Sequence, residues 1–125
     1  MTGVIGYART MLHGGKFAPA AVENFADEVR RFHNTLGELH ADFENPELEA
    51  SISDYQFLQG PLSDAMTHAG QLAILRRLSG SPVASENFIF ARVETDNVGE
   101  AQAEPAAPDD DWAPDLAARP PGQRR

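Results

Sequence analysis

The residues of this sequence with the most useful chemistry are four histidines and the carboxylates close to them, because the chain contains no cysteine. Asp64 and His68 are four residues apart, and on a helix this spacing places both side chains on one face, one turn apart. A carboxylate and an imidazole in that arrangement can share a divalent metal ion such as Zn²⁺ or Ni²⁺. A structural alternative stays open, in which Asp64 stabilises the first turn of a helix and His68 bonds a neighbouring carbonyl.

A metal centre here needs a third protein ligand, because a catalytic zinc ion is normally held by three protein side chains with one position open. His33 and His40 are seven residues apart, about 10 Å along a helix, so one of them but not both could reach the ion. We therefore predict a metal site made by His68, Asp64 and His40, with catalytic residues unknown. The alternative for His33 and His40 is that their polar tips face water at the edge of a core.

Three stretches with helical spacing must position these residues, near 3–13, 20–43 and 61–79. The longest stretch carries apolar residues at alternating spacings of three and four, which is the a/d pattern of helical bundles and coiled coils. These residues, which we call the apolar seam, are Val22, Phe25, Val29, Phe32, Leu36, Leu39 and Phe43. Pro19 favours a helix start at residue 20, and Pro46 favours a stop before it.

Glycine and proline mark the ends of the other two stretches. Gly60 and Pro61 suit the start of the later one, because proline at the first helical position gives up no useful N–H. Gly80 suits the left-handed position that follows the last turn of a helix, and Gly14 and Gly15 stop the first stretch after His13.

Three helical stretches without an alternating strand pattern predict an all-α protein, an up-down helical bundle of the four-helix type. Three helices would leave part of the apolar seam uncovered, and a monomer should not expose so much apolar surface. We therefore expect a fourth helix, which either precedes Met1 in a longer sequence or comes from a second chain. A homodimer is the expected assembly.

Composition divides the chain into a helical domain, residues 1–93, and an acidic tail rich in proline and alanine, residues 94–125. More than half of the formal net charge of −9 lies in the tail. Its few large apolar residues, Val98, Trp112 and Leu116, cannot offset the entropy of ordering it, so we predict disorder. A docking peptide around Trp112 is the alternative.

Several functional classes are disfavoured by composition. Neither part carries a basic stripe, which argues against nucleic acid as a partner. No apolar run approaches the roughly 20 residues of a membrane span, and the N-terminus lacks the features of a signal peptide. With no cysteine either, we expect a cytoplasmic protein that does not bind membranes. Neither a serine nucleophile motif nor a glycine-rich phosphate loop is present.

Two stretches resemble the DinB/YfiT-like family of metal-binding four-helix bundles. Residues 60–80, which read GPLSDAMTHAGQLAILRRLSG, look like the late helix that carries H-x-x-x-H-R-G-Q-L in that family. Residues 4–9 look like the family's second helix. The likeness covers about residues 3–93 and includes no match for the first helix.

The resemblance implies a four-helix bundle, often dimeric, with a three-histidine divalent site and reactions that use a small thiol. The second histidine of the family's helical pair matches His68, and the first falls on Asp64. The family's arginine is replaced by Ala69. The second-helix histidine falls on Val4, which cannot bind a metal ion.

Two functions follow as expectations. The first is a DinB-like divalent-metal protein acting as a transferase or hydrolase, whose ion polarises water or lowers the pKa of a small thiol substrate. The second is a non-catalytic helical bundle, a degenerate or truncated relative of the family, that serves as a structural or interaction module.

Overall fold

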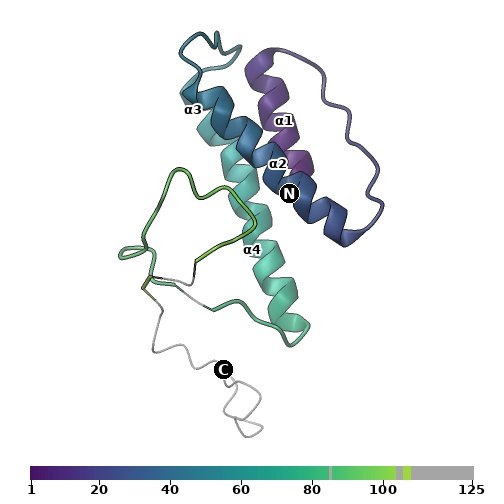
Figure 1. Cartoon of the computed structure of the whole chain (residues 1–125), viewed down its shortest axis with the longest axis vertical. Helices are drawn as coiled ribbons and strands as arrows, with labels where there is room; N and C mark the ends of the chain where they lie inside the picture. Colours follow the sequence, from purple (N-terminus) through teal and green to yellow (C-terminus); the bar gives the residue numbers. More distant parts are fainter. Residues whose placement is uncertain (85, 104–105, 108–125) are drawn as a thin grey trace, which may run out of the picture. The chain divides into compact units, whose positions relative to one another are not determined.

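The computed structural model describes residues 1–84, 86–103 and 106–107 (Figure 1). The regular elements in these residues are all helical and include no strand, so the protein is all-α as predicted. The elements are α1 (Thr2–His13), α2 (Phe25–Glu44), α3 (Asp54–Phe57), the short π-helical segment η1 (Leu58–Leu62) and α4 (Ser63–Leu78).

The chain divides into two compact units. The first contains Met1–Leu72 and Thr95–Gln102, and the second contains Ala73–Glu94 and the residues from 103 onward. The first unit holds α1, α2, α3, η1 and the first part of α4.

α1 packs against α2, and the two helices run in the same direction (Figure 1). Thr2 at the start of α1 lines a small hollow together with Arg31 of α2, and His13 at its end contacts Asp42. Residues 14–24 make this order possible, because an extended linker of that length is about twice as long as α1. The up-down order expected of consecutive helices therefore does not describe this pair.

The sequence signals for helix ends are confirmed at three places. Gly14 ends α1 in the left-handed conformation, with a φ of 71°. α2 ends at Asn45, directly before the proline. After α4, Gly80 has a φ of 79°, and the N–H of Ser81 donates to the carbonyl of Arg76 at 3.0 Å. This bond pairs a carbonyl that the helix itself leaves unpaired.

The predicted start of the long helix at residue 20 is wrong, because α2 begins at Phe25. Asn24 is extended, and its side-chain oxygen accepts a hydrogen bond from the backbone N–H of Asp27 at 2.9 Å. Asparagine is one of the best residues for capping a helix N-terminus, and this bond outweighs the preference of Pro19 for a first turn. Val22 consequently lies outside the helix.

The predicted start of the last helix at Pro61 is also wrong, because helical structure begins at Asp54. Ser53 and Gln56 cap α3 by each accepting a hydrogen bond from the other's backbone N–H. Pro61 then lies inside η1, and α4 follows without a break. Proline lacks an N–H and its ring crowds the preceding turn, but the wider π-helical turn accommodates it without ending the helix.

A small apolar core holds the first unit together. Its buried members are Ile5, Ala8, Leu12, Leu39 and Phe57. The three from α1 follow the three-and-four spacing of one helix face, so α1 buries a continuous stripe against α2 and against the segment formed by Phe57 and η1. α1 is therefore the central element of this unit, although it is the shortest of the three predicted helices.

Much of the apolar seam and of α4 stays uncovered. Leu39 is buried and Phe32 packs against the core, but Phe25 is 83% exposed and Phe43 is 54% exposed. α4 buries none of its side chains, and Met66 on it is 70% exposed. All three predicted helices are thus present, but their apolar faces are only partly paired within the described part of the chain.

The second unit is held by local polar contacts. None of its described side chains is buried. Arg76 donates from its guanidinium to the backbone carbonyl of Ser81 at 2.9 Å. The carboxylate of Glu86 accepts the backbone N–H groups of Ala106 and Ala107 at 3.0 and 3.3 Å.

The described residues of the predicted tail, 94–103 and 106–107, form no helix or strand. Trp112 and Leu116 lie outside the described residues. The domain boundary after residue 93, the disorder of the tail and the docking peptide therefore stay predictions.

We expect Leu12→Ala to lower the free energy of unfolding by about 2–4 kcal/mol, because it leaves a cavity in a core of five side chains. Leu78→Ala is the matched control, because Leu78 is 79% exposed, and its effect should stay within about 0.5 kcal/mol. Urea unfolding followed by circular dichroism measures both. Equal losses in the two variants would contradict this assignment of the core.

Candidate functional site

Asp64 and His68 lie on one face of α4, as their spacing predicts. Nε2 of His68 is 3.6 Å from Oδ1 of Asp64, and Nδ1 of His68 is 3.0 Å from Oε1 of Gln71. When Nδ1–H donates to Gln71, the lone pair of Nε2 stays free for an ion. The side chains of His68 and Asp64 are 43% and 58% exposed, so the pair offers two ligands in contact with water.

The other histidines have separate environments. His40 is half-buried on α2. Nδ1 of His33 lies 2.9 Å from the carbonyl oxygen of Val98, and His13 contacts Asp42. Across the residues that the structure describes, no group of three or more metal-binding side chains forms. A metal site with His40 as the third ligand therefore stays a prediction.

A polar cluster joins α1 to α2. Arg9 and His13 are one turn apart on α1, and Glu38 and Asp42 are one turn apart on α2. Arg9 donates from Nε to Asp42 at 2.6 Å and from Nη1 to Glu38 at 2.5 Å. Nε2 of His13 lies 3.1 Å from the second carboxylate oxygen of Asp42. The Asp42 side chain is only 13% exposed, so the pairing with Arg9 is largely shielded from water.

These contacts keep both partners of the central pair charged. The hydrogen bond from Arg9 lowers the pKa of Asp42 below its usual value, burial opposes this, and His13 adds to the lowering. The hydrogen bond to Asp42 raises the pKa of Arg9. Because neither group exchanges protons near neutral pH, the pair acts as an ionic clamp between the two helices and not as an acid or base.

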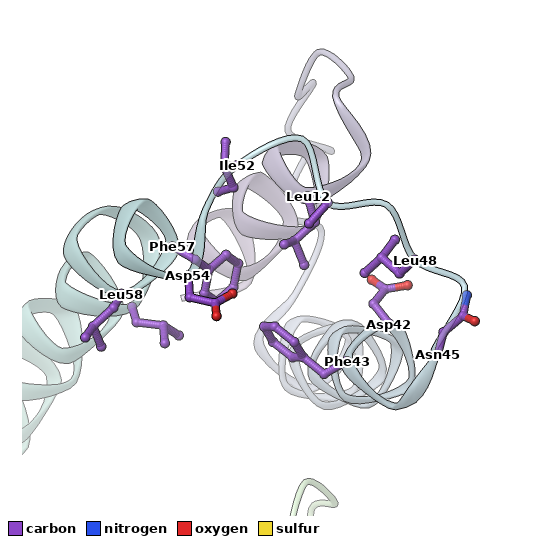
Figure 2. Close-up of a pocket in the computed structure, with 11 residues that line it drawn as sticks. Leu12, Asp42, Phe43, Asn45, Leu48, Ile52, Asp54, Phe57 and Leu58 are labelled. Atoms are coloured by element: carbon purple, nitrogen blue, oxygen red, sulfur yellow. The ribbon is translucent and has the colours of Figure 1, made fainter.

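A hollow of about 380 Å³ opens beside Asp42, where α1, the end of α2 and α3 come together (Figure 2). Phe43 and Phe57 form one wall, edge to face, with their ring centroids 5.1 Å apart. The loop that closes the hollow is fixed to α1 by a hydrogen bond from the N–H of Ser51 to the carbonyl of Leu12 at 2.8 Å. This volume falls in the range of small-molecule sites.

Sequence analysis did not identify the clamp or the hollow. A signal for the clamp does exist, because Arg9 and His13 are four residues apart, as are Glu38 and Asp42. Two bases on one helix face can match two acids on another, but only if the helices lie side by side in the right register. The hollow has no sequence signal, since its walls come from four separate elements.

We expect Asp42→Asn to lower the free energy of unfolding by about 1–3 kcal/mol at neutral pH, because it removes charge-assisted hydrogen bonds in a shielded place. The folded-state pKa of Asp42 is lowered, so its contribution is present above its unfolded-state pKa of about 3.9. That contribution is lost as the pH falls through the folded-state value. Asp96→Asn, at an exposed position, is the control.

Urea unfolding between neutral pH and pH 2 tests this directly. The difference between wild type and Asp42→Asn should shrink below about pH 4, whereas Asp96→Asn should match wild type throughout. A difference that stayed constant down to pH 2 would show that the charge of Asp42 contributes nothing.

Comparison with known proteins gives no relative from which a role could be transferred. No family model, curated protein or solved structure matches the chain. Among the described residues, no helix is long and apolar enough to cross a membrane.

Proposed function

We propose that this chain is a non-catalytic helical module that binds a second copy of itself through the uncovered seam of α2. The observation that carries the proposal is the exposure of that seam. Phe25 and Phe43 at its two ends are 83% and 54% exposed, while Val29 and Leu36 between them are half-buried. α1 covers the middle of the seam and leaves its ends to water.

A second copy suits this surface for two reasons. The three-and-four spacing from Phe25 to Phe43 is the pattern that pairs with a helix of the same pattern, and an identical chain supplies one. Near Phe25 the charges beside the seam are also paired, because Asp27 pairs with Arg30 and Glu28 pairs with Arg31. Two copies can therefore meet at that end of α2 without local repulsion, despite the acidic net charge.

The size of the core supports the same conclusion. Five buried apolar side chains give little stabilisation against the entropy of ordering a chain of this length. Burial of apolar side chains in a dimer adds about 25 cal/mol per Å² removed from water. Association would then contribute to the stability of the fold as well as to function.

A metal-binding role is the second proposal, and the environment of His68 favours it. The bond between Nδ1 of His68 and Gln71 fixes the ring so that Nε2 lies beside Asp64. Two ligands bind zinc or nickel weakly, and His40 or a residue of a second copy would have to supply a third. With an ion in place, the site would act on water or a small thiol, as the DinB-like resemblance implies.

For self-association, we expect equilibrium sedimentation at micromolar concentration to show a dimer. Phe25→Ser should weaken the dimer about tenfold or more, because it removes a large apolar side chain from the seam without touching the core. Tyr55→Ser is the matched control, since Tyr55 is 84% exposed and lies off the seam. A monomeric wild type at these concentrations would refute the proposal.

For the metal, calorimetric titration with zinc or nickel should show one weakly bound equivalent per chain. His68→Ala should abolish binding, because it removes the imidazole, and Asp64→Ala should weaken it. His40→Ala should weaken binding if His40 is the third ligand. His33→Ala is the control, because its Nδ1 already bonds Val98. The metal proposal fails if wild type and His68→Ala bind alike.

A further inference from the structure

The hollow beside α3 has a chemical character of its own. Its apolar walls come from Leu12, Phe43, Leu48, Ala50, Ile52, Phe57, Leu58 and Leu62. Its polar lining consists of Asp42, Asn45 and Asp54. Among the described residues, no basic side chain lines it. An open apolar hollow with acidic groups at its edge favours a ligand with an apolar body and a positive charge.

The two carboxylates at the hollow differ in what they already bind. Figure 2 shows Asp54 on the α3 side, beside Phe57, and Asp42 on the opposite side, near Leu48. Both carboxylate oxygens of Asp42 already have partners, because Arg9 donates to each of them and Nε2 of His13 lies beside Oδ1. The carboxylate of Asp54 has no hydrogen bond or ion pair within the described part of the chain. Asp54 is thus the charge that a ligand could neutralise.

The remaining polar group at the edge is also engaged. The side-chain oxygen of Asn45 accepts a hydrogen bond from the backbone N–H of Glu47 at 3.0 Å. The clamp behind Asp42 contains two carboxylates and one guanidinium, together with His13. Its net charge is negative when His13 is neutral, so it adds to the attraction for a cation.

The aromatic wall favours the same ligand class. In the wall that the two rings form, Phe57 is 4% exposed, whereas Phe43 is 54% exposed and can contact a ligand. An exposed aromatic ring is stabilised when the apolar part of a ligand packs against it and removes it from water. From the apolar lining of the hollow, the unpaired Asp54 and the exposed ring, we infer that the hollow binds a small organic ammonium ion, with its charge at Asp54 and its apolar body against Phe43.

The test compares three probes of one shape: 2-phenylethylammonium, neutral 2-phenylethanol and anionic 3-phenylpropanoate. Each is titrated into the full chain in metal-free buffer at neutral pH, and amide chemical shifts are followed by NMR. The ammonium ion should give saturable shifts at residues of the hollow. It should bind about two- to fivefold more tightly than the alcohol, the range for a solvent-accessible ion pair, and the anion should bind least.

Variants assign that preference to one carboxylate. Asp54→Asn should make the ammonium ion and the alcohol bind alike, and Asp54→Glu should keep the preference. Glu49→Gln removes a carboxylate from the loop between α2 and α3. Because Glu49 does not line the hollow, this variant should bind the probes as wild type does. Leu48→Ala should weaken the ammonium ion and the alcohol equally, because it removes part of the apolar wall.

Two results would overturn the inference. One is equal binding of ammonium and alcohol by wild type, and the other is the absence of saturable shifts up to concentrations on the order of 10 mM. Circular dichroism of each variant confirms that the helices are retained. Phe43 belongs both to the seam and to the hollow, so sedimentation of the same samples with and without the ammonium ion separates ligand binding from self-association.

Discussion

The contact between α1 and α2 is the interaction on which the first unit depends. It combines an apolar stripe, Ile5, Ala8 and Leu12, with an ionic clamp in which Arg9 reaches Asp42. The stripe is not directional, and burial alone would tolerate more than one register. The clamp is directional, because the two nitrogens of Arg9 meet both oxygens of Asp42, and it fixes the register and the parallel order of the two helices.

That register determines where everything else in the unit lies. It brings the ends of α1 and α2 together, so the loop after α2 returns to α1 and is fixed there by the bond from Ser51 to Leu12. α3 then delivers Phe57 into the core, and the hollow forms between these pieces. The same geometry leaves Phe25, at the far end of α2, without cover.

The chemistry-bearing residues lie outside this core. Asp64 and His68 are exposed on α4, and Asp54 stands at the edge of the hollow. An exposed pair of ligands gains little from a low dielectric, so strong metal chemistry would need a partner to exclude water from it. Binding of a partner or a small cation does not require that water be excluded from these ligands, because it uses surface that the fold already exposes.

The sequence by itself determined the all-α class, the stop of each predicted helix and the shared face of Asp64 and His68. These depend on contacts within about one turn, which spacing and end-capping residues specify. The start of α2 at Phe25 also rests on such a local contact, the hydrogen bond that Asn24 accepts from the backbone N–H of Asp27. Tertiary structure decided the passage of the helix through Pro61, the parallel order of α1 and α2, and the hollow. The spacing of apolar residues along the sequence does not predict these features. They depend on which helix faces meet, and a seam spaced for a partner does not say whether that partner belongs to the same chain.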